Sequence, residues 1–343
     1  MLFLAFLLGT YVAGQRARKV GINPARIQDL AIWIFVFGIG GARLTYMWVY
    51  DVPFRDFLKL WDGGLIFYGS AIGGIIGFVF AYIFVVRKHN LSGWTIVDVV
   101  APSIALGLCL GRLGCLLNGC CYGNVACPDC TFQSHFPLSA PPRFDLVSKG
   151  YQTTAGFSLT ESALQTPTVG SVDPASPMGL AGLQAGDVIL EVNETLVSGP
   201  GDLDLAMGQN WPRGRNDLSL KVKRGGSELV IGPTTPVTIG LQPTQLFSSV
   251  GNLIMFLLLL AYSPIKTREG QVMNLLLFIY PVHRFLIECL RNDTQRFDLA
   301  SWWPQLTLSQ NISVGMFIGA IVMAMFVWRH PKLTSSSQTE LAR

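Results

Sequence analysis

Long apolar runs, rather than alternating apolar and polar residues, dominate most of the chain. Six of them approach or exceed the roughly 20 residues that a helix needs to cross a bilayer. They occupy residues 30–50, 63–86, 96–117, 245–262, 272–289 and 311–328. The pattern predicts six membrane-spanning helices.

A seventh apolar run is shorter and lies at the start of the chain. Residues 1–14 (MLFLAFLLGTYVAG) have no basic residue ahead of them, and the basic cluster QRARK follows them. A secretory signal peptide has the opposite order, with its positive charge before the apolar segment. We therefore interpret this run as a first span, which brings the predicted number to seven.

Basic residues predict the orientation of these spans, because short cytoplasmic loops carry an excess of Lys and Arg. Such residues gather after the predicted first, third, fifth and last spans, at Arg16, Arg18, Lys19, Arg26, Arg87, Lys88, Lys266, Arg268, Arg329 and Lys332. The N-terminus is then expected outside and the C-terminus in the cytoplasm. The expected location is a bacterial inner membrane.

Residues 120–240 interrupt the apolar pattern for far longer than the about 4–6 residues of an ordinary connection. PLSAPPR at 137–143 indicates a linker, and alternation in DVILEVN (187–193) and LSLKVKR (218–224) predicts strands. The predicted fold class is an all-α polytopic membrane protein with an inserted, mostly β extracytoplasmic domain. Its expected parts are spans 1–4 (1–118), a Cys-containing loop and linker (119–154), the β domain (155–237), and spans 5–7 with a cytoplasmic tail (238–343).

The β domain carries one string with a specific resemblance. SVDPASPMGLAGLQAGDVILEVNETLV resembles the central part of a PDZ domain, in which a small-residue helical turn and a Gly-Asp step lead into a strand. The resemblance implies binding of an extended peptide by strand addition, with AGFSL at 155–159 as the candidate carboxylate loop. The alternative is a domain that only spaces or stabilises the outer part of the protein.

Composition excludes two broad classes. Charged residues make up 13% of the chain, against about 25% in soluble domains, so a wholly soluble protein is excluded. The net charge of +4 is small and scattered, which argues against a nucleic-acid partner.

Ionisable residues inside the predicted spans are candidate functional groups, because a charge in the bilayer is costly unless it is paired or solvated. Arg112 lies in GRLGCLLNGCCYG, and Arg284, Glu288 and Arg291 in HRFLIECLR are spaced to share one helix face. Arg43 lies near the outer end of the second span. Arginines at this depth suit a phospholipid phosphate. The alternative is that Arg284 pairs with Glu288 while Arg112 reaches to the interface.

The motifs together resemble the prolipoprotein diacylglyceryl transferase family. They run in order through the membrane portion as GGARLTY, LWDGGLIFYGSAIGG, VDVVAPSIALGLCLGRLGCLLNG, QPTQLF, HRFLIECLRND and ISVGM. The resemblance implies transfer of a diacylglyceryl group from phosphatidylglycerol to the lipobox cysteine that follows a prolipoprotein signal peptide. Glycerol phosphate is the expected leaving product.

The resemblance also implies residue roles. Arg112 matches the arginine that contacts the headgroup, and Asn118, Gly119 and Gly123 match the rest of that signature. Arg284 matches an essential arginine, with Glu288 and Arg291 in its accompanying pattern. Gln245 matches the polar residue of a HPxQLYE motif. Tyr68 stands where many members have His. Its glycine neighbours in WDGGLIFYGSAIGG leave room for a substrate, and the alternative is that it is an ordinary interface aromatic. Four positions depart from the family pattern. Gln242 replaces the His and Ser248 the Glu of the HPxQLYE motif, while Cys115 replaces an Asn and Cys120 a Glu of the signature around Arg112.

The implied chemistry makes Arg112 and Arg284 stabilise the departing phosphate, while Tyr68 takes or relays the thiol proton. No cofactor and no metal are expected, since His89, His135, His283 and His330 are dispersed and form no HExxH motif. This also argues against an intramembrane metalloprotease. A transporter is disfavoured because the charges gather at helix ends rather than at the midplane.

Two further alternatives stay open at this point. Cys120, Cys121, Cys127 and Cys130 are predicted to form one or two disulfides on the oxidising face, and a zinc site at the C-x2-C pair is the alternative. The lost His and Glu also leave room for a catalytically weakened relative, an adaptor that binds lipoprotein precursors or phospholipid.

Overall fold

The computed structural model describes residues 1–59, 66–87, 91–127, 130–148, 155–160, 166–208, 210–212, 214–292, 296–297, 304–329 and 331. The chain divides into two compact units. The helical unit comprises Met1–Gly114, Phe247–Cys289 and Gln295–Arg343, and the insert unit comprises Cys115–Leu246 and Leu290–Thr294. His89 and His330 lie outside the described residues.

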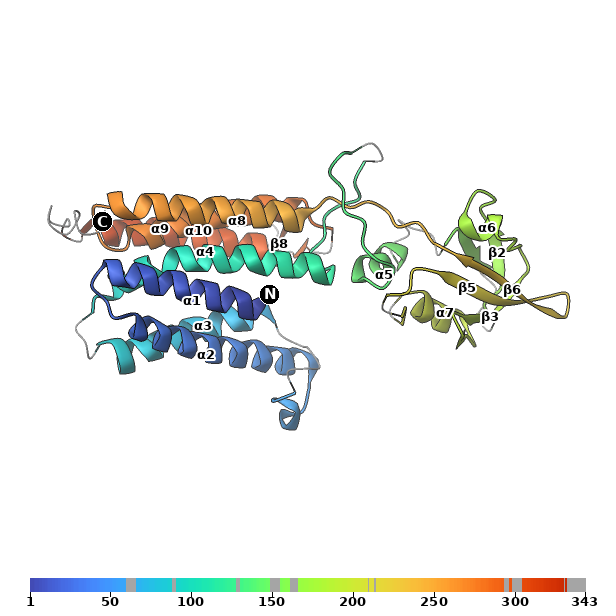
Figure 1. The fold of residues 1–343 in the computed structure, drawn as a ribbon, viewed down its shortest axis with the longest axis horizontal. Helices are drawn as coiled ribbons and strands as arrows, with labels where there is room; N and C mark the ends of the chain where they lie inside the picture. Colours follow the sequence, from blue (N-terminus) through green and yellow to red (C-terminus); the bar gives the residue numbers. More distant parts are fainter. Residues whose placement is uncertain are drawn as a thin grey trace. The chain divides into compact units, whose positions relative to one another are not determined.

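Helices build the described part of the helical unit (Figure 1). They are α1 (Leu2–Lys19), α2 (Pro24–Tyr50), α3 (Phe67–Ala81, continued by a π-helix at Tyr82–Val86), α4 (Gly93–Asn118), α8 (Thr244–Tyr262), α9 (Gln271–Cys289) and α10 (Leu308–Arg329). Each coincides with a predicted apolar run. A two-residue ladder of β7 (Arg296–Phe297) and β8 (Leu306–Thr307) precedes α10.

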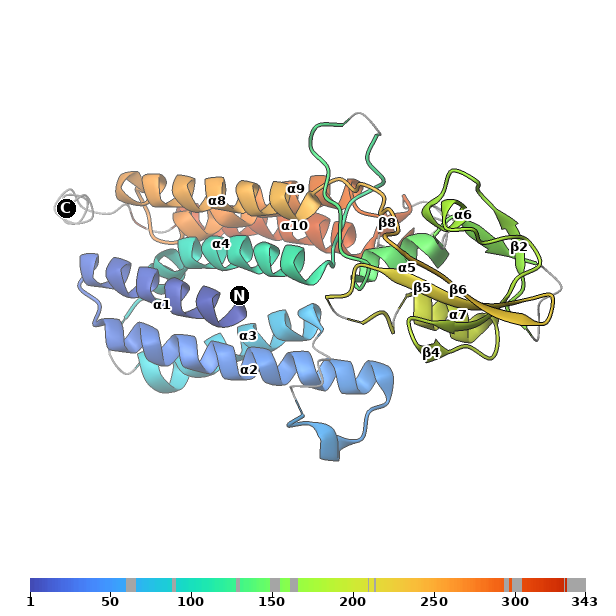
Figure 2. The ribbon, with the colours of Figure 1, turned by 45° about the vertical axis from the view of Figure 1, so that its right-hand side comes forward.

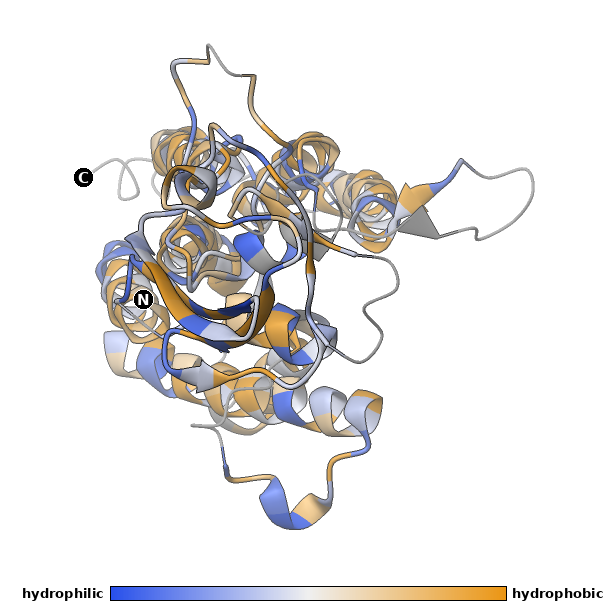
Figure 3. Cartoon of the chain, turned by 90° about the vertical axis from the view of Figure 1, so that its right-hand side faces the viewer, coloured by the Kyte–Doolittle hydropathy of each residue, from blue (hydrophilic) through white to orange (hydrophobic). Residues whose placement is uncertain are grey.

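Among the described residues, five helices are long and apolar enough to cross a membrane: α2, α4, α8, α9 and α10. Hydrophobic colouring surrounds the helices when they are viewed along their axes (Figure 3), and large apolar side chains such as Ile76, Leu257 and Ile321 are exposed. A helix that is apolar on all sides belongs in a core or a bilayer. The predicted polytopic membrane protein is confirmed at this level, while seven spans and their orientation stay predictions.

Helices α2 and α3 pack backbone against backbone. A Cβ atom on Gly69 would overlap the carbonyl oxygen of Gly41, and one on Gly73 would overlap that of Phe37. Small residues permit this close approach between membrane helices. Helix α2 therefore fills the space beside the described glycines that follow Tyr68, where the sequence suggested room for a substrate.

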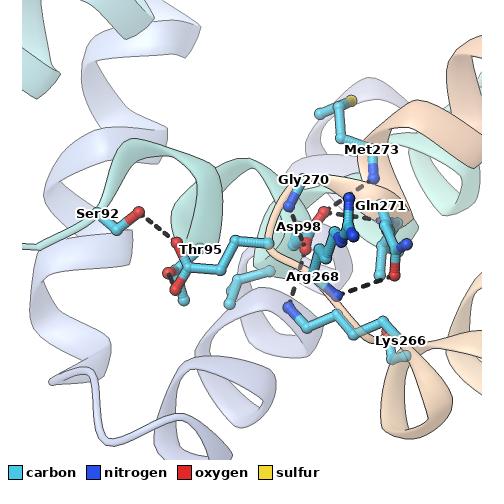
Figure 4. Close-up of polar contacts among 12 residues, drawn as sticks. Ser92, Thr95, Asp98, Lys266, Arg268, Gly270, Gln271 and Met273 are labelled. Atoms are coloured by element: carbon cyan, nitrogen blue, oxygen red, sulfur yellow. Dashed lines mark hydrogen bonds and ion pairs between the residues drawn. The ribbon is translucent and has the colours of Figure 1, made fainter. Parts of the chain in front are cut away.

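The buried carboxylate of Asp98 on α4 organises one end of the helical unit (Figure 4). Its Oδ2 accepts hydrogen bonds from Lys266 Nζ and the Gly270 amide, each at 2.8 Å. Its Oδ1 accepts from the amides of Val272 and Met273 at 2.9 and 3.0 Å. The first amides of a helix have no partner within it, so this carboxylate caps α9 from a neighbouring helix.

Arg16 fastens α1 to the same part of α4. Pro102 has no N–H, so the carbonyl of Asp98 lacks its donor within the helix. Arg16 replaces that donor, with Nη2 at 3.1 Å from the Asp98 oxygen and Nε at 3.1 Å from the Val99 oxygen. The same Nη2 also donates to Ser263 Oγ at 2.7 Å. A proline inside α4 thus creates the acceptor that binds α1.

The insert unit contains most of the described strands (Figure 2). They are β1 (Phe157–Leu159), β2 (Val169–Val172), β3 (Val188–Val192), β4 (Thr195–Leu196), β5 (Leu218–Arg224) and β6 (Ser227–Thr234). Antiparallel β4-β3-β5-β6 form one sheet, and β1 and β2 form a separate ladder. The strands predicted at 187–193 and 218–224 are confirmed as β3 and β5.

Short helices complete the insert unit: α5 (Pro141–Ser148), α6 (Pro177–Leu180) and α7 (Pro200–Met207). The prediction of a linker at 137–143 is wrong in part, because Leu138 joins the apolar core of the insert and Pro141 begins α5. Proline is well suited to the first turn of a helix, where its missing N–H has no intrahelical partner to lose. The remaining core side chains include Val169, Met178, Ile189, Leu203, Trp211, Leu218 and Val222.

The segments that enter and leave the insert run beside each other as a stalk. Backbone hydrogen bonds of 2.8–3.2 Å join them. They link Gly123, Asn124, Ala126 and Ser134 on the outgoing segment to Gly240, Leu241 and Gln242 on the returning one. The ends of the β-rich region are therefore held together by main-chain pairing.

Asp187 supports the turn before β3. Arg224 Nε and Nη2 donate to its two carboxylate oxygens at 2.7 and 2.6 Å, and the Gln184 amide donates at 2.9 Å. The Asp187 side chain is 1% exposed. The Arg224 guanidinium therefore holds the pKa of Asp187 below its ordinary value.

Replacement of Asp98 by Ala is expected to destabilise the helical unit by about 3–5 kcal/mol, because the Lys266 ammonium loses its buried partner. Thermal unfolding of the full chain in detergent measures the effect. Asp29→Ala is the control, since its ion pair with Arg26 is exposed and such pairs contribute little. Equal unfolding temperatures for Asp98→Ala and the parent chain would contradict the proposed anchoring.

Asp187→Asn is expected to speed amide exchange in β3 and β5 at pH 7. The free energy of opening should fall by about 1–3 kcal/mol, the contribution of a hydrogen bond to a charged group. Because the native pKa is lowered, the stabilisation exists above the unfolded pKa of about 3.9 and disappears as pH falls through the native pKa. Hydrogen-exchange mass spectrometry, comparing variant and parent at each pH, tests this, with Glu228→Gln at an exposed ion pair as control. A difference that persists unchanged in strong acid argues against the pair.

Candidate active site

Arg284 is held at the centre of a polar cluster in the helical unit. Its Nη1 lies 2.6 Å from Glu288 Oε2, one turn further along α9, and its Nη2 donates to Ser309 Oγ at 2.6 Å. The predicted shared helix face is confirmed for Arg284 and Glu288, and so is the ion pair between them that was the alternative. It is wrong for Arg291, because α9 ends at Cys289 and Arg291 follows it in an extended bridge with Gly123. Two contacts at different nitrogens fix both the position and the plane of the guanidinium, which suits it to bind an anion such as a phosphate in a defined orientation.

The partner carboxylate is itself fixed by the start of α10. Glu288 Oε1 accepts a hydrogen bond from Thr307 Oγ1 at 3.0 Å. Thr307 and Gln310 exchange bonds in a capping box, with Thr307 N donating to Gln310 Oε1 at 3.0 Å and Gln310 N donating to Thr307 Oγ1 at 3.2 Å. The helix cap of α10 thereby orients the carboxylate that orients Arg284.

Tyr68, at the start of α3, belongs to the same cluster. Its hydroxyl lies 3.2 Å from Ser309 Oγ, the atom that also receives the Arg284 hydrogen bond. Ser309 thus joins two of the predicted catalytic residues, although it was not among the predicted site residues. The T-x-x-Q pattern before the last apolar run could have placed it one residue inside the start of a helix.

Arg112 and His283 are the remaining cationic and basic side chains of this region. Among the described residues, Arg112 makes no side-chain hydrogen bond or ion pair, and it is half-buried. His283 lies within electrostatic range of both Arg112 and Arg284. Its ring hydrogen-bonds the backbone of Ser248, while Nε2 is buried without a partner. The family comparison by sequence gave His283 no role.

Arg43 is placed differently from the other predicted phosphate ligands. It is buried on α2, its Nη2 donates to the Asp56 carbonyl oxygen at 2.8 Å, and its guanidinium lies 5.5 Å from the centre of the Tyr46 ring. These contacts fasten the loop after α2. A substrate contact of Arg43 stays a prediction.

In the insert unit, α4 ends in a Schellman motif at the predicted Asn-Gly signature. The Gly119 amide donates to the Leu116 oxygen at 3.2 Å and the Cys120 amide to the Cys115 oxygen at 3.1 Å. Gly119 has φ +74°, which a residue without a side chain adopts at little cost. Asn118 is exposed immediately before this turn.

Gln245 and Gly123 support the loop that follows. Gln245 Nε2 donates to the Cys120 oxygen at 2.9 Å, and Thr244 Oγ1 donates to the Cys121 oxygen at 2.8 Å. Gly123 forms a backbone bridge with Arg291, and a Cβ atom on Gly123 would lie 2.8 Å from the side chain of Thr244. The structure thus gives Gln245 and Gly123 architectural roles, and their contact with substrate stays a prediction.

The predicted disulfide cysteines separate into two pairs. Cys127 and Cys130 are joined in a disulfide. Cys120 and Cys121 are not, and their thiols lie beside Cys115 instead. Of the one or two disulfides predicted among these four cysteines, the structure thus contains one. Cys120 and Cys121 take no part in it, because the Schellman turn directs them back toward the last turn of α4.

Comparison with known proteins gives the family. The model of the family described as prolipoprotein diacylglyceryl transferase matches residues 1–326. The chain belongs to this family. The matched range includes residues of both units.

Curated relatives of the transferase family agree. A phosphatidylglycerol–prolipoprotein diacylglyceryl transferase of Rhodopirellula baltica is 28% identical, over 97% of this chain and 72% of that protein. One of Clostridium tetani is 26% identical, over 85% of this chain and 79% of that protein. One of Thermosynechococcus vestitus is 32% identical over only 44% of this chain and 55% of that protein.

A solved PDZ domain matches part of the chain. The HtrA3 PDZ domain bound to a phage-derived ligand is 26% identical and covers 24% of this chain and 81% of that domain, with a TM-score of 0.20. A TM-score this low supports no conclusion about fold. The PDZ-like character of the insert therefore stays a prediction.

Proposed function

We propose that the chain transfers the sn-1,2-diacylglyceryl group of phosphatidylglycerol to the lipobox cysteine thiol of prolipoproteins, releasing glycerol phosphate. Family membership across residues 1–326 and the names of the relatives support this activity in lipoprotein maturation. The observation that carries it is Arg284, held by Glu288 and Ser309 in a cluster that also contains Tyr68.

The reaction exchanges one bond for another at the glycerol carbon. The thiolate sulfur forms a bond to that carbon, the carbon–oxygen bond to the phosphate breaks, and glycerol phosphate leaves with the electron pair. The phosphate therefore gains one negative charge as it departs. Fixed cationic donors lower the barrier most when they are already in place before that charge moves.

Arg112 and Arg284 fit two complementary parts of this task. Arg284 is oriented by a carboxylate and a hydroxyl, so its guanidinium needs no reorganisation during the reaction. Arg112 has no side-chain partner among the described residues and is half-buried, so a lipid phosphate would not have to displace a protein group from it. We assign headgroup binding to Arg112 and stabilisation of the leaving phosphate to both.

A thiol with pKa about 8.5 is only slightly ionised near neutral pH, so the reaction needs a proton acceptor. Tyr68 is the proposed relay, because its hydroxyl reaches Ser309 and, through it, Arg284. His283 is a second candidate acceptor, since Nε2 is buried without a partner while the Ser248 backbone orients the ring. Many members of the family have His at the position of Tyr68, and His283 can supply the same proton-accepting imidazole from α9.

The insert is proposed to bind an extended segment of the precursor. Strand β1 pairs only with β2 among the described strands, which leaves one edge available for strand addition. The two residues before it, Ala155 and Gly156, have φ +73° and +92°, so the chain turns sharply just ahead of the strand. A full-length precursor is then a better substrate than a short lipobox peptide.

Arg112→Ala is expected to lower transfer about 100-fold or more, the usual cost of losing a preorganised charge-stabilising donor. The assay is mass spectrometry of the thioether-linked diacylglyceryl gain on a lipobox peptide and on a full-length precursor, with the protein in phosphatidylglycerol vesicles. Arg26→Ala is the matched control, because Arg26 is exposed and paired with Asp29. A parent chain that binds precursor without modifying it would favour the adaptor alternative.

Tyr68→Phe is expected to lower the transfer rate at least tenfold near neutral pH, with a smaller effect at high pH where the substrate thiol ionises without help. The pH–rate profile of the variant measures this. His283→Gln provides the comparison. Full activity of Tyr68→Phe together with a pH-dependent loss in His283→Gln would move the proton-accepting role from Tyr68 to His283.

A further inference from the structure

We propose that the thiols of Cys115, Cys120 and Cys121 form a binding site for a soft metal ion of the class that includes Zn²⁺ and Cu⁺. Their three Sγ atoms all lie within 4.8 Å of one another. Two sulfurs bound to one tetrahedral zinc, each at about 2.3 Å, lie about 3.8 Å apart. The thiols are therefore at most about 1 Å further apart than a shared tetrahedral ion requires, a distance that small side-chain rotations can close.

The backbone, rather than chance proximity, brings these thiols together. In the Schellman motif that ends α4, Cys115 occupies the third residue from the helix end and Cys120 the second residue beyond the cap. Side chains at these two positions normally contact each other. Cys121 has φ +60°, and this second left-handed turn returns its thiol toward the other two.

The loop that carries two of the ligands is held in place by buried polar groups. Gln245 and Thr244 are each 1% exposed and bind the carbonyl oxygens of Cys120 and Cys121. Hydrogen bonds behind a metal-binding segment orient its ligands and raise affinity. The site thus has a fixed shape before any ion arrives.

The donor set determines the class of ion. Three sulfur ligands favour soft ions such as Zn²⁺ and Cu⁺ over Mg²⁺ or Ca²⁺, which prefer oxygen. All three thiols are half-buried, so an ion can reach them and a fourth position remains for water or another ligand. The C-x2-C pair that the sequence offered as a zinc site is not available, because Cys127 and Cys130 are in a disulfide.

A bound ion would cross-link the last turn of α4 to the following loop. Asn118 and Gly119 lie between the first and second ligands, so their positions would become fixed. Binding would also displace thiol protons. The site stands on its own geometry and does not depend on the proposed transferase activity.

The test uses the full chain in detergent micelles, purified without oxygen. Titration with Zn²⁺ and, separately, with Cu⁺ against a chromophoric chelator is expected to show one bound ion per chain. Cys115→Ser and Cys120→Ser should each weaken binding at least tenfold, whereas Cys289→Ser, outside the cluster, should leave it unchanged. The tighter of the two ions identifies the metal.

Two further measurements make the result decisive. Co²⁺ should give a sulfur-to-metal charge-transfer absorption in the parent chain that is absent in Cys115→Ser, and matched unfolding temperatures without metal show that the variant is folded. The same titrations in the Cys127→Ser, Cys130→Ser double variant exclude those sulfurs as ligands. Binding that ignores Cys115→Ser, or a Cys115–Cys120 disulfide in protein kept from oxygen, would overturn the proposal.

Discussion

The helical unit depends on a buried carboxylate that serves several chain segments at once. Asp98 neutralises Lys266 after α8, caps the first amides of α9, and offers through its carbonyl an acceptor for Arg16 of α1. A fixed start determines the rotation of α9 about its axis. Arg284 lies 13 residues after Gln271, about 20 Å further along at 1.5 Å per residue. Asp98 thus caps the beginning of the helix whose second half carries Arg284.

The arginines differ in their hydrogen-bonding partners, and this difference distinguishes those that hold the structure together from those that can bind a substrate. Arg16, Arg43 and Arg224 all direct their guanidinium groups to oxygens of the protein, and these contacts hold loops or helices together. Arg112 makes no such contact within the described part of the chain. Arg284 combines both situations, since the groups that hold it also connect it to Tyr68 through Ser309. An arginine on a membrane helix is therefore judged by its partners more than by its depth.

Sequence patterns predicted those features that depend on neighbours along the chain. Apolar runs predicted the helices, alternation predicted β3 and β5, and the four-residue spacing predicted the pairing of Arg284 with Glu288. Contacts between distant segments were beyond such patterns: Ser309 is 241 residues from Tyr68. The glycines near Tyr68 were interpreted as space for a substrate, but α2 fills the space beside those that follow Tyr68. The sequence shows that a side chain is absent there and does not show what lies in its place. The sequence also left open how the four cysteines pair: one disulfide forms, and the other two thiols lie beside Cys115 of the preceding helix.

The stalk of the insert has a consequence for how such a chain arises. Its outgoing and returning segments are joined by main-chain hydrogen bonds, so the two ends of the β-rich region lie close together. The β-rich region beyond it closes a loop whose ends are fixed, and the entropic cost of lengthening a closed loop grows only slowly with its length. A domain could therefore be acquired, exchanged or lost beyond this point during evolution with little penalty to the rest of the chain. The stalk therefore allows the insert and the helical unit to change separately during evolution.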